Sequence, residues 1–123
     1  MWIEFNNNPV GRAVEDCTVR ALSKALNMTW DEAHMELAEA SRQMGDMMHS
    51  TSVLSALLRK NGFTRHAISN VCPDCYTIED FAYDHPHGTY VIGTGSHVVT
   101  IENGNIWDSW DSSMEIPQYF WKR

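Results

Sequence analysis

The chain has 123 residues, of which 43% are hydrophobic and 20% charged, and its formal net charge is −7 at pH 7. This composition predicts one globular domain over residues 1–123, because such a chain can form a single hydrophobic core and is too apolar to remain disordered. The acidic charge and the scattered Lys and Arg argue against nucleic acid as a general partner. No apolar stretch approaches a membrane span, and the first residues lack the pattern of a signal peptide.

Three helices are predicted in the first half of the chain. Residues 16–27 carry apolar side chains at helical spacing, with Asp16 as the expected N-cap. A capping box beginning at Thr29 starts the second helix, which Gly45 is expected to end. Residues 50–60 form the third predicted helix.

The second half of the chain changes to the two-residue period of strands. Residues 63–69 and 88–93 are predicted strands, and residues 77–82 are predicted to form a short capped helix between them. The aromatic run 119–121 is expected to cover the core. Helices followed by strands indicate an α+β fold.

A tight hairpin is predicted at residues 103–104, because their Asn-Gly sequence is the strongest short signal for a two-residue turn. In that register Thr100 faces Trp107. His97 and Asp108 then become diagonal neighbours on one face, about 7–8 Å apart between Cα atoms. The same face is predicted to carry four more side chains: Val99, Ile101, Ile106 and Trp110.

Cys17 lies at the start of the first predicted helix, followed much later by His97 and Asp108. A thiol at a helix N-terminus lies at the positive end of the helix dipole, which favours the thiolate. A neighbouring imidazole favours it further, and an acid behind the imidazole fixes its tautomer. These residues therefore predict a reactive thiol, although a lone cysteine is more often a small buried side chain. Asp111 is the alternative acid, because a three-residue turn would reverse the faces of the hairpin.

In these motifs the chain resembles a minimal papain-like cysteine peptidase of the kind found in phage and bacterial genomes. Bacteriocin-leader peptidases show a similar order of cysteine helix, histidine strand and aspartate. The resemblance covers roughly residues 8–111 and is carried by residues 16–22, 80–82, 85–91, 97–99 and 103–111. It implies a papain-like α+β fold in which N-terminal helices, the first beginning at the catalytic cysteine, pack on a small antiparallel sheet from the C-terminal half.

The resemblance also implies a function. Cys17 would be the nucleophile, His97 the general base and Asp108 the orienting acid of a thiol hydrolase that cleaves a peptide or isopeptide bond. A protein or peptide is the expected substrate, no cofactor is expected, and the expected location is the cytoplasm of a bacterium or a phage-infected host.

The glutamine that usually precedes the cysteine in papain-like enzymes, as an oxyanion donor, is missing from residues 6–14. Asn8 and Arg12 are the expected substitutes beside the backbone N–H of Cys17, with Asn7 as a further alternative. The asparagines are also typical of a turn. Losing one such donor typically costs about 2.7–4 kcal/mol of transition-state stabilisation. A second function therefore stays open, a catalytically weak or inactive papain-like fold that binds protein.

Cys72 and Cys75 form a Cys-x-x-Cys pair. Such a pair can supply half of a zinc site, completed here by His66, His85 or His87, or it can act as a redox pair. Because the sequence has no second pair, we predict thiols in a loop and no bound metal. The odd total of three cysteines also favours a reducing compartment with at least one free thiol.

Overall fold

The structure is a computed structural model that describes residues 1–73 and 75–123. In chain order its elements are β1 (Trp2–Glu4), α1 (Cys17–Ala25), α2 (Trp30–Met44), α3 (Thr51–Lys60), β2 (Thr64–Ala67), α4 (Ile78–Asp84), β3 (Thr89–Gly93), β4 (Val98–Glu102), β5 (Asn105–Asp108) and β6 (Tyr119–Lys122). Over the described residues, four helices and a six-stranded sheet confirm the predicted α+β class. None of these helices is long and apolar enough to cross a membrane.

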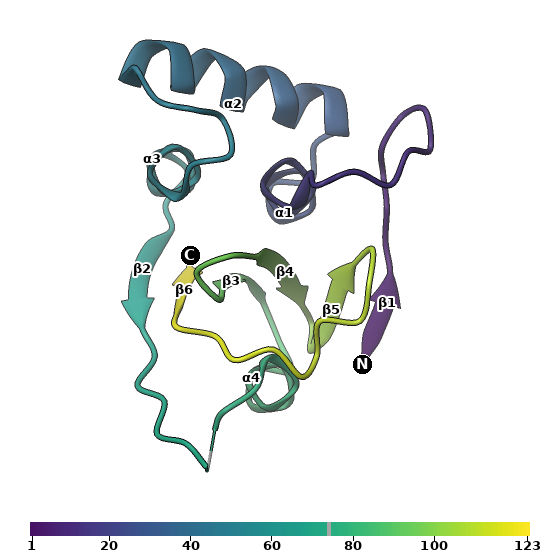
Figure 1. Ribbon diagram of the computed structural model, residues 1–123, viewed down its shortest axis with the longest axis vertical. Coiled ribbons are helices and arrows are strands. Elements are labelled where there is room, and N and C mark those ends of the chain that lie inside the picture. The colour runs from purple at the N-terminus through teal and green to yellow at the C-terminus, as the bar shows by residue number, and fades with distance from the viewer. Residues whose placement is uncertain (74) are drawn as a thin grey trace.

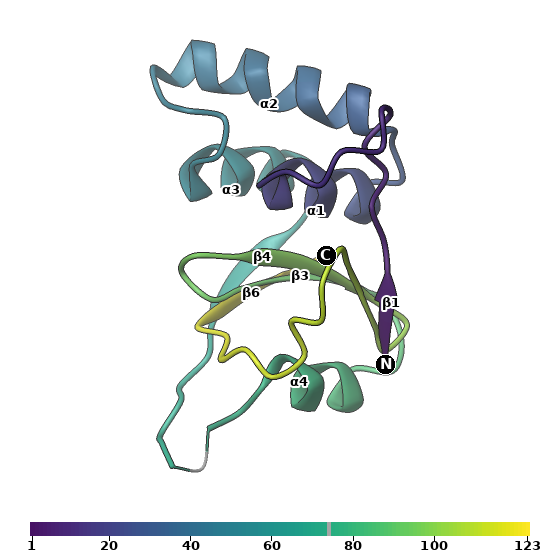
Figure 2. The ribbon, with the colours of Figure 1, turned by 45° about the vertical axis from the view of Figure 1, so that its right-hand side comes forward.

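Helices cover both faces of the sheet (Figures 1 and 2). The helices α1 and α3 lie on one face, α2 crosses them on the side away from the sheet, and α4 covers the opposite face. Each face has its own hydrophobic cluster. The cluster under α1 to α3 includes Leu22, Leu54 and Leu58 with Val98 and Trp121 of the sheet. The cluster under α4 includes Ile78, Phe81, Ile92, Val99, Ile101 and Ile106.

The sheet is mixed, with the strand order β1-β5-β4-β3-β6-β2. The strand β1 pairs in parallel with β5, whereas the other pairings are antiparallel. The expectation of an antiparallel sheet from the C-terminal half alone was therefore wrong, because the N-terminal residues add a parallel edge strand. The aromatic run 119–121 lies within β6, between β3 and β2. Its Tyr119 and Trp121 are buried in the cluster under α1 to α3, so the run packs on the core as expected.

Local sequence explains how α2 begins and ends, but not how α1 begins. Thr29 Oγ1 accepts the N–H of Glu32, whose side chain accepts the N–H of Thr29, which is the predicted capping box. Gly45 ends α2 in the left-handed conformation, with φ of 66°. Asp16 precedes α1 but makes no side-chain capping bond, because its carboxylate pairs with Arg20 instead. The predicted capping role of Asp16 is therefore wrong.

Candidate active site

Cys17 is the first residue of α1, and α1 packs on β4, which begins directly after His97. This packing places the half-buried Cys17 thiol against the His97 ring and the backbone N–H of Val98. Burial by itself would raise the pKa of the thiol. Hydrogen bonding with His97 and from the Val98 N–H outweighs it and lowers the pKa of Cys17 below its ordinary value. The site therefore favours the thiolate.

His97 connects Cys17 to Asp108. The Nε2 atom of His97 lies 2.6 Å from Oδ2 of Asp108, the last residue of β5. Burial by itself would lower the pKa of His97, but the hydrogen bond to Asp108 and the contact with Cys17 raise that pKa to about 9. The contacts with Asp108 and Cys17 therefore favour the imidazolium form of His97.

The predicted hairpin register is confirmed, and it selects Asp108 over Asp111. Thr100 pairs with Trp107, and the turn lies at residues 103–104. Asp111 is exposed, and its Oδ1 accepts the backbone N–H of Ser113 at 3.1 Å. Hydrogen bonding with Ser113 lowers the pKa of Asp111. The structure therefore brings together Cys17, His97 and Asp108, and leaves Asp111 outside.

The predicted common face of the hairpin was only partly correct. Val99, Ile101 and Ile106 pack under α4, on the opposite side of the sheet from α1. His97 and Asp108 lie at the ends of their strands, and their side chains meet Cys17 and Arg20 of α1. The register therefore gave the correct acid while misplacing its apolar neighbours.

Four donors hold the fully buried carboxylate of Asp108. Its Oδ1 accepts Arg20 Nη2 at 2.9 Å and the Ser109 N–H at 2.8 Å, and its Oδ2 accepts Ser112 Oγ and His97 Nε2, each at 2.6 Å. Burial by itself would raise the pKa of Asp108, but the hydrogen bonds from His97 and Ser112 and the charges of His97 and Arg20 lower it. The carboxylate is therefore ionised and fixed in orientation.

Trp110, expected on the same face as His97, lies over the histidine ring. The two ring centroids are 4.7 Å apart at an interplanar angle of 45°. Trp110 itself is 43% exposed. The indole therefore shields the His97 ring on one side while presenting its own surface to solvent and to anything bound there.

No protein family, curated protein or solved structure matches this chain. The assignment of this site therefore rests on the chain's own side chains. The hydrogen bonds that join Cys17, His97 and Asp108 lower the pKa of the thiol, raise that of the imidazole and lower that of the buried carboxyl. Perturbed titratable groups of this kind concentrate at functional sites, which makes this cluster the candidate active site of the chain.

The side chains expected to bind an oxyanion do not join this cluster. The Oδ1 of Asn8 accepts a backbone N–H two residues later in a turn, and Arg12 is exposed. Over residues 1–73 and 75–123, no hydrogen bond or ion pair connects either side chain to Cys17 or His97. The Nδ2 of Asn7 donates to an α1 hydroxyl well beyond Cys17. The assignment of Asn8 and Arg12 as oxyanion donors therefore receives no support from contacts.

Cys72 and Cys75 are joined by a disulfide, so the expectation of two loop thiols was wrong. Sulfurs bonded to each other are not thiolates and do not coordinate zinc. Among the described residues, no cluster of three His, Cys, Asp or Glu side chains could hold a metal ion. The rings of His66 and His85 stack on phenylalanine rings instead. Cys17 is the free cysteine of the described residues.

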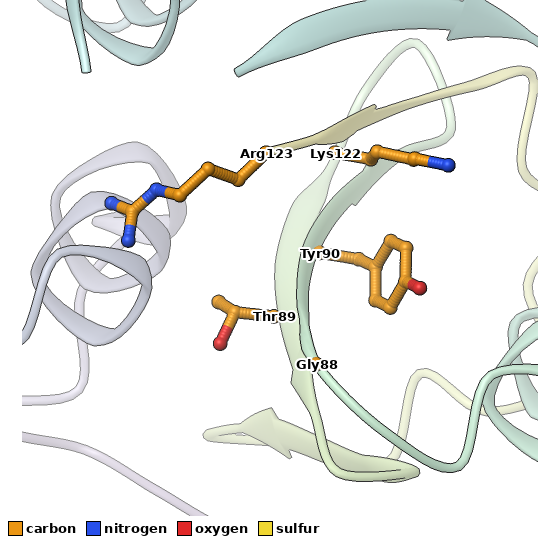
Figure 3. Close-up of a pocket in the computed structure, with 5 residues that line it drawn as sticks. All are labelled: Gly88, Thr89, Tyr90, Lys122 and Arg123. Carbon is orange, nitrogen blue, oxygen red and sulfur yellow. The ribbon is translucent and has the colours of Figure 1, made fainter. Parts of the chain in front are cut away.

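Two surface cavities lie away from the cluster. One, of about 250 Å³, lies at the start of β3 and the end of β6 (Figure 3), at the opposite end of β3 from the loop that carries His97. Its lining side chains point in two directions from the strands: Thr89 and Arg123 to one side, and Tyr90 and Lys122 to the other. The other, of about 440 Å³, lies among the end of α2, α3 and β2. Neither is lined by Cys17, His97 or Asp108.

Arg20 and Ser112 contact the carboxylate of Asp108, and the sequence motifs did not reveal either contact. For Arg20 the sequence signals only the pair with Asp16, because the two are four residues apart, a spacing at which opposite charges meet on a helix. For Ser112 no local signal exists, since a serine four residues after an acid is unremarkable within a loop.

Proposed function

We propose that this protein is a thiol hydrolase with a papain-like fold, in which Cys17, His97 and Asp108 form the catalytic triad. The observation that carries the proposal is the continuous contact from the Cys17 thiol through the His97 ring to the buried Asp108 carboxylate. A cysteine at the start of a helix that packs on the histidine-bearing strand is also the order of parts in papain-like enzymes.

In this proposal the Cys17 thiolate attacks the carbonyl carbon of a peptide or isopeptide bond and forms a carbon–sulfur bond. The His97 imidazolium gives its proton to the leaving amine as the carbon–nitrogen bond breaks. Neutral His97 then takes a proton from water, whose oxygen attacks the thioester. The carbon–sulfur bond breaks, the acid product leaves, and the thiolate and imidazolium are restored. Asp108 holds the His97 ring in one orientation throughout.

The backbone of α1 offers one oxyanion donor. The first N–H to donate within α1 is that of Arg20, which bonds Asp16 O at 2.8 Å. The N–H of Cys17 therefore lies outside the hydrogen bonds of its own helix, at the positive end of the helix dipole. It is available to the oxygen that becomes negative when the sulfur attacks.

A second candidate function is a non-catalytic protein-binding module with the same fold. The observation that favours it is the absence, among the described contacts, of any bond from Asn8 or Arg12 to Cys17. Binding would then use the surface around the exposed ring of Trp110. The two candidates differ in one property, which is whether Cys17 reacts as a thiolate near neutral pH.

The deciding experiment is alkylation with limiting iodoacetamide near neutral pH, followed by peptide mass spectrometry. We expect Cys17 to be labelled first, both in the native protein and after the disulfide between Cys72 and Cys75 has been reduced to give two reference thiols. His97→Ala should slow the labelling of Cys17. Reduced Cys72 or Cys75 reacting ahead of Cys17 would favour the binding module.

Cys17→Ala separates a nucleophile from a structural cysteine. We expect this variant to lose all reaction with a peptide-based thiol probe while keeping its thermal midpoint close to that of the wild type, because the sulfur is half-buried and faces the site. Truncating a fully buried side chain would instead leave a cavity and lower the midpoint. A marked loss of stability, together with no probe reaction in the wild type, would rule out the catalytic function.

A further inference from the structure

We propose that Arg20 is a positioning residue that joins the helix bearing Cys17 to the acid of the triad and offsets the negative charge of Asp16 and Asp108. This inference rests on the proposed function, because it concerns how the same thiol is activated. The guanidinium of Arg20 bonds Asp16 through Nη1 and Asp108 through Nη2, the latter at 2.9 Å. All three side chains are buried.

The geometry makes Arg20 a rigid link. Asp16 directly precedes α1 and Arg20 lies one turn further along, on either side of Cys17 in the sequence, whereas Asp108 ends β5. The planar guanidinium presents its donors in a fixed fork, so it can hold two carboxylates at once in one geometry. On its far side, Asp16 Oδ2 accepts Trp30 Nε1 of α2 at 2.9 Å. The position of Cys17 relative to His97 is thus fixed through Asp108, Arg20 and the helix itself.

The charges of the site give Arg20 a second effect. With Cys17 as thiolate and His97 as imidazolium, the site holds three negative groups and two positive ones, since Asp16 and Asp108 are carboxylates and Arg20 is a cation. Without the guanidinium, the buried carboxylate of Asp16, which directly precedes Cys17, and that of Asp108, behind the His97 ring, would be offset only by the imidazolium. Nearby negative charge disfavours a thiolate and raises the pKa of its thiol.

The other charged groups near α1 are paired elsewhere. On the next turn of α1, Lys24 Nζ lies 3.4 Å from Glu102 of β4 and 3.8 Å from the centroid of the Trp107 ring. From α2, the ring of His34 stacks on Trp30, whose N–H holds Asp16. In the described part of α3 and β3, no charged side chain forms an ion pair with Asp16, Arg20 or Asp108. Arg20 is thus the cation placed to offset both carboxylates.

The test is the pH dependence of iodoacetamide alkylation of Cys17, read by mass spectrometry in a set of charge variants. Arg20→Met should move the midpoint of the alkylation curve to higher pH. A one-unit rise would slow alkylation about tenfold on the acidic side. Asp16→Asn should move the midpoint to lower pH, because its amide oxygen can still accept the Trp30 N–H but carries no charge. The double variant removes one charge of each sign, so its midpoint should return to that of the wild type.

Arg20→Lys keeps the charge but cannot hold both carboxylates in the same fixed geometry. It should therefore keep the wild-type midpoint while losing thermal stability. If Arg20→Met does not fold, the same argument is tested by Asp16→Asn and by the double variant, in which only one buried carboxylate is left. Unchanged midpoints in the folded variants would refute the proposal for Arg20, even if the wild-type thiol is reactive. If the alkylation midpoint of wild-type Cys17 equals that of an ordinary thiol, that result would count against the proposed hydrolase. The opposite shifts expected for Arg20→Met and Asp16→Asn could still be measured relative to that midpoint, so the two proposals are tested separately.

Discussion

Replacing Asp108 with Asn should destabilise the protein strongly, because its two buried carboxylate oxygens accept four hydrogen bonds. An amide has one oxygen and one NH₂ group, so in either orientation its nitrogen points at two of the four donors. The change also removes one of the two carboxylates that bind the buried Arg20. Breaking a buried ion pair from one side costs about 3–5 kcal/mol, and we expect a loss in that range.

Urea denaturation followed by circular dichroism measures this loss. With a slope of about 1–3 kcal/mol per M, a loss of that size moves the midpoint by about 2 M urea. Asp111→Asn is the matched control, since it makes the same chemical change three residues later at an exposed carboxylate, and it should leave the midpoint unchanged. A loss below about 1 kcal/mol for Asp108→Asn would refute the reasoning, because it would mean that the buried donors do not depend on the carboxylate.

Three further predictions follow from the described contacts. The ring of His97 should titrate by NMR with a pKa of about 9, and with a lower pKa in Cys17→Ala, where no thiolate favours the imidazolium. In that variant the hydrogen bond to Asp108 still favours protonated His97. The folding free energy gained from protonating His97 is therefore fully present below its ordinary pKa of 6.5, and it is lost as the pH rises through the pKa of His97 in the folded state. A pH-independent free energy of unfolding across that range would contradict this linkage. Gly93→Ala should cost about 1–3 kcal/mol in urea denaturation, because its Cβ would overlap the Tyr119 ring. An equal loss in a Tyr119→Leu background would exclude this clash as the cause. Metal analysis of protein purified without chelator should find no stoichiometric zinc, whereas about one zinc per chain, lost on Cys72→Ser, would overturn the prediction of no metal.

The sequence predicted the parts of this protein that depend on near neighbours. The capping box at Thr29, the stop at Gly45 and the hairpin turn at residues 103–104 were all found from side chains only a few residues apart. These motifs placed Cys17 at a helix start and brought His97 beside Asp108, so three of the candidate site residues followed from local signals. Local rules suffice there because capping and tight turns satisfy backbone groups within the same short segment.

Only the tertiary structure decided which distant residues complete the site and the sheet. Asp16 was expected to cap α1, yet its carboxylate turns to Arg20, whose guanidinium reaches Asp108, 88 residues further along the chain. Likewise, β1 and β6 are short strands whose places in the sheet depend on partners far away in the sequence. Such pairings cannot be predicted from a short segment, because their free energy depends on a distant partner and on the burial of both partners in the folded protein. The chain's local signals therefore indicated the candidate site residues, and the packing of α1 on the sheet determined what holds them in place.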